Sequence, residues 1–297
     1  MEIFRKLCYY KVKCIAKGEM QVELNWLQSL FYGFLSGLTE FFPVSADAHR
    51  RLYLALFGLS ESESGLLFSA RLGCLLAVIF ATLPLLNRLD RERRFSAMSR
   101  RRTKRQPDTR TMASLHLIKV AIFPVLLGLL AFRLYEPVMD RLWLLALLLT
   151  VNGIMLYIPQ FLPSGNKDSL NLTTMDALLV GIAGAAGVIP GLSRIGMMTS
   201  VSGMRGTDRR YGLDIGLLLC IPVLLVLTVL DAGAWIISGG LTFLSLLRYL
   251  CTAAASFGGA YLSIITMRFI SFKSGYSGFA YYSWGLALSA FILYLSI

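Results

Sequence analysis

"GLTEFFPVSADAHR" (residues 37–50) is a polar stretch in a chain that is otherwise strongly apolar. It lies at the end of an apolar run, residues 26–43, that is too short to cross a membrane comfortably and that ends at a proline. A second short apolar run, residues 174–189, is also followed by a proline, in "VIPGLSRIG" (residues 188–196). Short apolar segments broken by Pro and Gly in matching positions of two halves are typical of re-entrant helices at a binding site. The two stretches therefore predict two re-entrant helix hairpins.

The composition is that of an integral membrane protein. The chain has 297 residues, of which 56% are hydrophobic and only 15% charged, and its mean hydropathy is +0.64. Ordinary globular domains carry about 25% charged residues. We expect continuous membrane-spanning runs at residues 65–86, 115–134, 142–162, 212–232, 243–270 and 277–296. The predicted fold class is an all-α integral membrane protein with about six transmembrane helices and the two hairpins.

The charge distribution predicts the orientation of the chain. Residues 88–110 contain ten Lys or Arg and three acidic residues. A short basic loop between two spans is typical of the cytoplasmic side. We favour this interpretation over a nucleic-acid patch, so no nucleic-acid partner is expected, and the loop is expected to contact anionic lipids. With this loop in the cytoplasm, the first hairpin opens to the outside and the second to the inside, which predicts an inverted-topology repeat.

The chain is expected to form one membrane domain, residues 26–297. Repeat one covers about residues 26–134 and repeat two about residues 174–270, and residues 277–296 form a final span. Residues 1–25 form a basic N-terminal extension that is expected to lie at the membrane interface. This extension would start outside, against the usual distribution of positive charge.

The second polar stretch has the features of an anion site. Ser193 and Arg194 follow a Pro-Gly turn that contains Gly191, and they begin a short helix. The backbone N–H groups and the positive end of a helix dipole bind anions, and an arginine holds a phosphate through two parallel hydrogen bonds. An arginine inside a membrane is costly and so indicates a functional site. The alternative is an arginine that extends from an ordinary helix end to the membrane surface.

The first polar stretch supplies acid–base groups. Glu40 needs a partner, a proton or a metal ion at membrane depth, so it is expected to act as a general acid or base or as a ligand to a hard cation. His49 is a proton-transfer group or a nucleophile for phosphoryl chemistry. Ser45 is a candidate N-cap, with His49 four residues on along the same helix face. The alternative is that Ser45 only caps the helix and His49 makes a structural hydrogen bond.

Arg71 is a charged residue within the apolar run at residues 65–86. A buried arginine needs a compensating charge. We expect it to pair with Glu63 or with a carboxylate of the site, or to contact an anionic group.

Together the two stretches resemble the bacterial undecaprenyl-diphosphatase family, the bacitracin-resistance membrane phosphatases. That family carries a Glu-x-x-x-Glu-Phe-Leu-Pro-x-Ser-Ser-x-Gly-His block and a Pro-Gly-x-Ser-Arg-Ser-Gly block, which appear here as "SGLTEFFPVSADAH" (residues 36–49) and "PGLSRIG" (residues 190–196). The resemblance implies a multi-pass enzyme of the bacterial plasma (inner) membrane. It would remove the terminal phosphate of a C55 polyprenyl diphosphate, recycling the lipid carrier for peptidoglycan, with a divalent cation, Mg²⁺ or Ca²⁺.

The resemblance also assigns roles to residues. The expected catalytic residues are Glu40, Ser45, His49, Ser193 and Arg194. Gly191, Ser193 and Arg194 are also the expected substrate-binding residues, and Glu40 is an expected metal ligand. Asp47 and Arg71 do not match family positions; their own charges add both to the expected substrate-binding residues and add Asp47 to the expected metal ligands. The expected partner is the polyprenyl diphosphate in the membrane, and a homodimer is included among the expected assemblies.

Several positions depart from the family pattern, and Asp47 and Ala48 follow Ala46 as further departures. Ser36 stands at the first Glu position, Ala46 at the second Ser of the Ser-Ser pair, Ile195 at the Ser after the arginine, and Arg71 where the family usually has Gln. The losses remove a carboxylate and hydroxyl groups from the site. They leave a second hypothesis open, a polyprenyl-phosphate flippase or a lipid-binding pseudoenzyme on the same fold.

Overall fold

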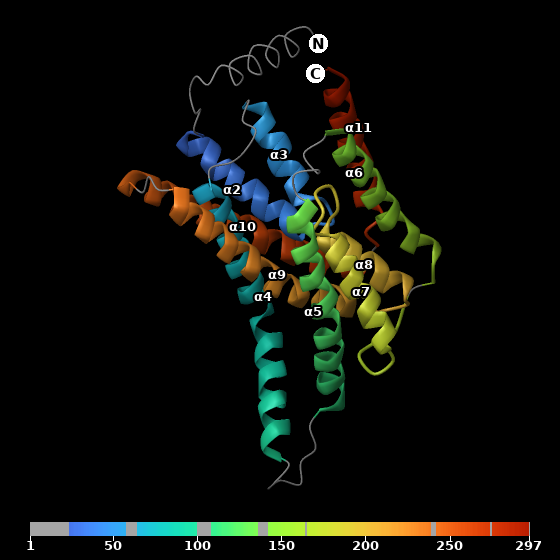
Figure 1. Ribbon diagram of the computed structural model, residues 1–297. Coiled ribbons are helices and arrows are strands. Elements are labelled where there is room, and N and C mark those ends of the chain that lie inside the picture. Colours follow the sequence, from blue (N-terminus) through green and yellow to red (C-terminus); the bar gives the residue numbers. More distant parts are fainter. Residues whose placement is uncertain are drawn as a thin grey trace.

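The computed structural model describes residues 24–57, 64–99, 108–135, 142–163, 165–238, 242–273 and 275–296, and this part of the chain contains helices and no β-strand. The helices are α2 (Trp26–Phe41), α3 (Ala46–Leu56), α4 (Ser64–Ser99), α5 (Thr109–Tyr135), α6 (Leu142–Tyr157), the 3-10 helix η2 (Ile158–Phe161), α7 (Thr174–Ala186), α8 (Arg194–Met204), α9 (Arg209–Ser238), α10 (Phe243–Lys273) and α11 (Gly278–Ser296) (Figure 1). Most of the expected N-terminal extension lies outside the described residues.

Six helices in the described part of the chain are long and apolar enough to cross a membrane, which confirms the predicted all-α membrane fold with about six transmembrane helices. They are Ser64–Ser96, Thr109–Leu129, Leu142–Phe161, Arg209–Ile237, Phe243–Ser271 and Gly278–Leu295. Many large apolar side chains on these helices are exposed, among them Leu76, Phe80 and Phe123. Such exposure is costly in water and favourable in lipid, so the protein is a multi-pass membrane protein.

The prediction that residues 88–110 form a loop is wrong for half of that segment. Helix α4 continues to Ser99, and α5 begins at Thr109. Arginine and glutamate are good helix formers, and Arg94 pairs with Asp90 one turn earlier at 2.8 Å, so this basic sequence favours continued helix. Figure 1 shows the last part of α4 and the first part of α5 extending together beyond the other helices.

Small residues bring the helices into close contact. Helix α2 packs along α10, where an added side chain at Gly33 or Gly37 would lie 2.4 or 2.0 Å from a carbonyl oxygen of α10. Gly181 of α7 meets the backbone of α5 in the same way, at 2.4 Å. The glycine spacings in these helices therefore serve close helix packing, as small residues do in membranes.

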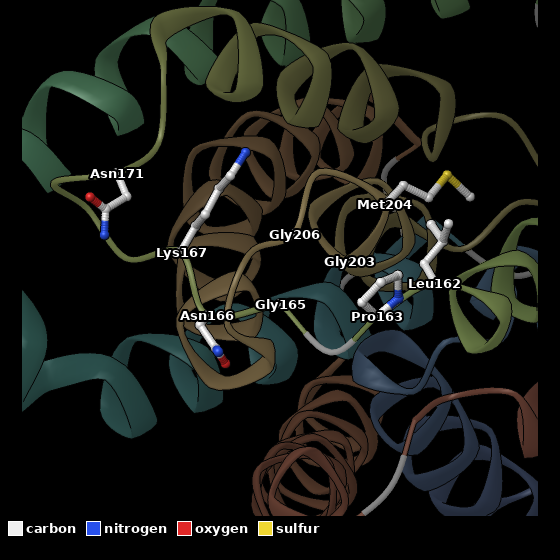
Figure 2. Close-up of a pocket in the computed structure, with 9 residues that line it drawn as sticks. All are labelled: Leu162, Pro163, Gly165, Asn166, Lys167, Asn171, Gly203, Met204 and Gly206. Carbon is white, nitrogen blue, oxygen red and sulfur yellow. The ribbon is translucent and has the colours of Figure 1, made fainter.

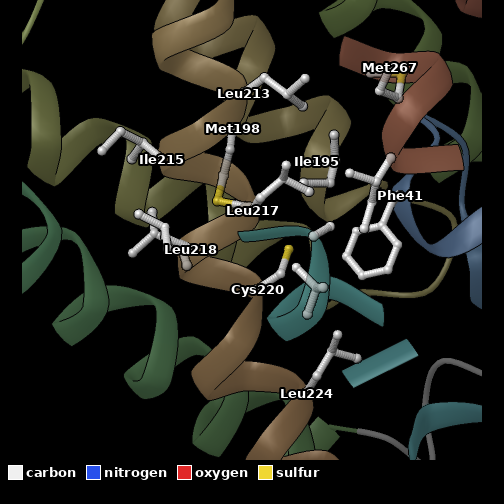
Figure 3. Close-up of a cluster of buried hydrophobic side chains, with 14 of the residues drawn as sticks. Phe41, Ile195, Met198, Leu213, Ile215, Leu217, Leu218, Cys220, Leu224 and Met267 are labelled. Carbon is white, nitrogen blue, oxygen red and sulfur yellow. The ribbon is translucent and has the colours of Figure 1, made fainter. Parts of the chain in front are cut away.

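The main hydrophobic core lies where α2, α4, α8, α9 and α10 meet (Figure 3). Its fully buried members include Phe41 and Ile195, which adjoin Glu40 and Arg194 in the sequence. Packing of these two side chains fixes the helix ends that carry the charged groups. Ile195 is thus a packing residue where the family pattern has a hydroxyl group.

Helices α2 and α3 form one antiparallel helix pair, and α7 and α8 form another. The Tyr53 hydroxyl of α3 donates to the Gln28 carbonyl of α2 at 2.9 Å. In the second pair Arg205, just after α8, contacts Asp176 of α7 at 2.5 Å. Burial tends to raise the pKa of Asp176, but hydrogen bonds from Thr173 and the Arg205 charge outweigh burial and hold that pKa below its usual value.

Replacement of Asp176 by Asn is expected to destabilise the second helix pair by about 1–2 kcal/mol, because it removes the ion pair and weakens the capping box at Thr173. A lower midpoint of thermal unfolding in detergent would show this. The wild-type contribution is present above the ordinary carboxyl pKa and is lost as the pH falls through the lowered pKa. The exposed pair offers a control, since Asp90→Asn should change the midpoint little. Equal midpoints for Asp176→Asn and wild type would contradict the assignment.

Candidate functional site

The two polar stretches of the sequence are bonded to each other. The Ser45 hydroxyl, in the turn between α2 and α3, accepts a hydrogen bond from the Gly191 N–H at 2.9 Å. In return, the Ser193 hydroxyl donates to the Phe42 carbonyl at 3.1 Å. Both serines are buried. The turns of the two helix pairs therefore interlock at one place in the fold.

Both serine hydroxyls also cap helices. Ser45 accepts from the Ala48 N–H at 3.3 Å at the start of α3, and Ser193 accepts from the Gly196 N–H at 3.1 Å at the start of α8. The predicted N-cap at Ser45 is present. With these bonds in place, each hydroxyl holds the backbone of one turn against the other.

Asn152 of α6 is a further link that the sequence did not indicate. It is fully buried, and its Oδ1 accepts from the Ser193 N–H at 2.9 Å. Its Nδ2 donates to the Pro43 carbonyl at 3.3 Å and to the Ser283 hydroxyl at 3.1 Å. One amide thus joins both turns to α6 and α11. The amide stands alone in an apolar run, and only the folded chain shows its partners.

Gly191 has a φ of +97°, and a Cβ at this position would lie 2.7 Å from the Leu148 side chain. We expect Gly191→Ala to destabilise the protein by about 2–4 kcal/mol, because it adds left-handed backbone strain to overpacking. The midpoint of thermal unfolding measures this. Gly285→Ala is the matched control, because no atom of the described residues beyond its own stretch of helix lies within 4 Å of the added methyl group. A Gly191→Ala protein as stable as the control would show that this turn tolerates a side chain.

A buried cluster of alternating charge lies beside the interlocked turns. Glu40 forms an ion pair with Arg194 through one carboxylate oxygen and contacts Arg50 through the other, at 3.5 Å. Arg50 also contacts Asp47 at 2.5 Å. The side chains of Glu40, Arg50 and Arg194 are buried, whereas that of Asp47 is about one third exposed. Two carboxylates and two guanidinium groups therefore form a cluster that is close to neutral.

Sequence reasoning missed Arg50 as a member of this cluster. It follows His49 directly, and its position three residues after Asp47 on α3 is the one available signal. The sequence analysis gave a role to Asp47 and none to Arg50. The two residues work as a pair.

His49 lies on the other face of α3 and has both ring nitrogens in hydrogen bonds. Nδ1 is 2.7 Å from the Ser45 carbonyl oxygen. A carbonyl oxygen only accepts, so Nδ1 carries the proton, and Nε2 of the neutral ring accepts from the Tyr282 hydroxyl at 2.6 Å. The sequence analysis gave Tyr282, on α11, no role at the site. The fold places it against the candidate catalytic base, with its ring parallel to the imidazole.

His49 and Tyr282 line a cavity of about 710 Å³. Its other walls come from α2, the turn after it, the end of α10 and the start of α11. The apolar lining residues are Leu35, Leu38, Phe42, Val44, Ile270 and Phe279. This cavity offers an apolar surface that ends at an imidazole, and it is large enough for part of a lipid chain.

A second cavity, of about 450 Å³, lies at the far end of α8 (Figure 2). It is lined by Leu162, Pro163, Gly165, Asn166, Lys167, Asn171, Gly203, Met204 and Gly206. Among the described residues of this lining, Lys167 is the one that is charged, and none of the predicted site residues contributes to it. Chemistry is therefore assigned to the first cavity.

Arg71 pairs with a residue that the sequence analysis did not consider. Its Nη1 lies 2.7 and 2.6 Å from the two carboxylate oxygens of Asp231 on α9. Neither site carboxylate contacts it directly, although its charge acts on Asp47. The suggested partner Glu63 lies outside the described residues. Arg71 thus contributes positive potential near the site while it joins α4 to α9.

The residues present do not fit the expected metal site. Both oxygens of Glu40 contact arginines, and one oxygen of Asp47 is bonded to Arg50. Among the residues that the structure describes, no group of three or more His, Cys, Asp or Glu side chains is placed to hold a metal ion. Ser36, at the family's first Glu position, is fully buried and its hydroxyl has no hydrogen-bond partner in the described part of the chain.

Fold and site together define a multi-pass membrane protein with a cluster of arginines and carboxylates between two interlocked helix turns. The chain belongs to the family of the bacitracin resistance protein BacA, whose model matches residues 29–289. Bacterial members lie in the inner membrane, which is where this multi-pass chain is placed.

Three relatives illustrate the similarity. A Carboxydothermus hydrogenoformans protein named undecaprenyl-diphosphatase is 28% identical over 91% of this chain and 98% of its own length. A Nocardioides protein of the same name is 31% identical over 68% of this chain and 73% of its own. Undecaprenyl-diphosphatase 1 of Shouchella clausii is 28% identical over 91% of this chain and 96% of its own.

Proposed function

We propose that this protein hydrolyses undecaprenyl diphosphate, or a similar polyprenyl diphosphate, to the monophosphate and inorganic phosphate. The reaction recycles the lipid carrier for cell-wall synthesis. The names of the relatives and the family match support it. The observation that carries it is that both polar stretches form one site, with His49 at the end of an apolar cavity.

Arg194 and Arg50 are the residues that bind the diphosphate in this proposal. Glu40 contacts both guanidinium groups, so it fixes their positions inside the protein. Each guanidinium has five N–H donors, and the carboxylates use only part of them. The remaining donors can bind phosphate oxygens and stabilise the charge that develops during phosphoryl transfer. Ser45, Ser193 and Gly191 act as positioning residues, because their bonds set the turns that carry these side chains.

His49 is the proposed general base. Its Nδ1–H is held by the Ser45 carbonyl, which leaves the Nε2 lone pair toward the cavity side where Tyr282 now donates. A water molecule that replaces the tyrosine hydroxyl at Nε2 would lose its proton to the ring as its oxygen attacks the terminal phosphorus. The polyprenyl monophosphate then leaves along the apolar cavity.

We also infer that the two helix pairs are re-entrant and that the chain is an inverted repeat. The packing of the helices supports this, since α2 packs on α10 as α7 packs on α5, and α4 packs on α10 as α9 packs on α5. The pairs α4 with α9 and α6 with α11 then lie across the repeat axis. The site falls at the repeat interface, where such folds place their ligands.

The basic end of α4 suggests where the protein meets anionic lipids. Arg91, Arg93 and Arg94 lie toward the C-terminal end of α4 (Ser64–Ser99). Figure 1 shows that this end of the helix extends beyond the bundle with α5. The charge of these arginines would attract anionic headgroups at the cytoplasmic surface. This supports the expected lipid contact at residues 88–110.

The test is release of phosphate from a polyprenyl diphosphate by the purified full-length protein in detergent. Wild type is compared with a double variant, His49→Ala with Arg194→Ala, and the expected result is release by wild type alone. Assays run with EDTA, Mg²⁺ and Ca²⁺ in parallel. Equal release by both proteins in all three buffers would contradict the proposed hydrolysis.

A further inference from the structure

We propose that the guanidinium of Arg50 takes the place of a divalent cation in this site. The protein would then bind a lipid diphosphate between Arg50 and Arg194 without Mg²⁺ or Ca²⁺. For hydrolysis, this inference rests on the proposed function. For binding, it rests on the geometry of the charged cluster.

Arg50 occupies the position between the two carboxylates that were expected to hold a metal. It lies 3.5 Å from Glu40 and 2.5 Å from Asp47, and its side chain is 5% exposed. A cation bound by both carboxylates would have to displace this guanidinium. The displaced charge would be left buried without its partners, which costs several kcal/mol. Binding of a metal is therefore opposed by the packing of the cluster.

The described part of the chain also lacks further ligands for such an ion. His49 uses Nδ1 for a backbone carbonyl and Nε2 for Tyr282. Ser36, at the position of the family's first Glu, offers no charge. The Cys74 thiol is hydrogen-bonded to the Ser256 hydroxyl at 3.3 Å. A hard cation prefers several oxygen ligands, and the only carboxylate oxygen of the cluster that no described arginine contacts is on Asp47.

Two guanidinium groups can supply the positive charge that a divalent cation would supply. Arg50 and Arg194 together carry two positive charges, as one Mg²⁺ does, and Glu40 holds them on either side of its carboxylate. Each adds planar N–H donors that match phosphate oxygens. Loss of the first family Glu at Ser36 fits the same change, because a site without a metal needs fewer carboxylates.

The experiment measures binding and hydrolysis of farnesyl diphosphate by the full-length protein in detergent, with EDTA or with Mg²⁺. Wild type should bind equally well in both buffers, within about twofold, and release phosphate at similar rates. Arg50→Gln should lose about 100-fold in affinity or rate in EDTA, as expected for removal of one strong charged donor. Mg²⁺ should restore at least about tenfold, because the variant frees two carboxylates for the metal.

Manganese binding, followed by electron paramagnetic resonance, gives a second readout. Wild type should hold no Mn²⁺ at the site, whereas Arg50→Gln should gain one bound ion. Arg50→Lys keeps the charge and should remain insensitive to EDTA. This variant tests the inference even if Arg50→Gln does not fold. Arg268→Gln, which removes a half-exposed arginine on α10, is the matched control and should behave as wild type.

The outcomes separate this inference from the proposed function. Binding or phosphate release by wild type only with a divalent cation would overturn the role of Arg50 and leave the hydrolysis intact. Binding in EDTA that depends on Arg50, without phosphate release in any buffer, would support the role of Arg50 and contradict the hydrolysis. Binding in EDTA that is unchanged in Arg50→Gln would also overturn the inference.

Discussion

Replacement of Arg194 by Lys is expected to lower phosphate release about 100- to 1,000-fold. Lysine keeps the positive charge but not the planar donors that bind two phosphate oxygens at once. The residue begins α8, and Ser193 and Ile195 on either side of it are fixed by a cap and by the core. A lysine there has a defined backbone and an unsuitable head group, so the loss should appear in the rate and not in folding.

The measurement is the steady-state rate at saturating and at limiting substrate, with the midpoint of thermal unfolding recorded on the same samples. Arg268→Lys is the control, since it makes the same chemical change in an ion pair with Asp214 away from the cluster. A rate for Arg194→Lys within threefold of this control would mean that the arginine serves only to neutralise Glu40.

The membrane architecture followed from the sequence because a bilayer imposes a simple requirement on it. A span needs about 20 apolar residues, and six runs meet this length whatever they pack against. The predicted ends of the helices were less accurate than their number and positions. The basic segment after residue 88 reads as a loop by charge, yet arginine and glutamate stabilise helix once a helix has begun. The charge of a segment determines on which side of the membrane it lies, but not the residue at which a helix ends.

The candidate site was predicted in its parts and not in its connections. Glu40, Arg194 and the two turns were identified because polar residues are costly in a membrane and so are visible against the apolar background. Their pairing is a contact across 154 residues of sequence, which no local pattern encodes. Asn152 and Tyr282 were missed for a related reason. An amide or a tyrosine near apolar residues can be explained in many ways without a role at the site. Only the packing of α6 and α11 brings these two side chains to the turns.

Arg71 shows the limit of reasoning from charge alone. A buried arginine required a carboxylate, and that expectation was met by Asp231. The sequence analysis considered other partners for Arg71, because Asp231 lies 160 residues away, near the end of another span. The presence of a partner was determined by electrostatics, whereas its identity was determined by the packing of α4 on α9.

Replacement of His49 by Ala is expected to reduce phosphate release about 1,000-fold, within the range that general base catalysis contributes. Burial lowers the pKa of His49, so the wild-type rate should fall only as the pH drops below the ordinary imidazole pKa, where the ring becomes protonated and Nε2 can no longer accept a proton. The residual rate of His49→Ala should lack this dependence. That difference in pH profile separates a base from a residue that merely packs against the cavity.

Tyr282→Phe is the matched variant for this prediction. It removes the hydroxyl that donates to Nε2 and keeps the ring that lies parallel to the imidazole. Because the Ser45 carbonyl still holds Nδ1–H, the proton-accepting form of His49 is preserved, and the rate should stay within about tenfold of wild type. Two results would contradict the role as base. One is a His49→Ala rate equal to that of Tyr282→Phe. The other is a phosphate from labelled substrate found covalently attached to His49 after rapid quenching, which would make the imidazole the nucleophile.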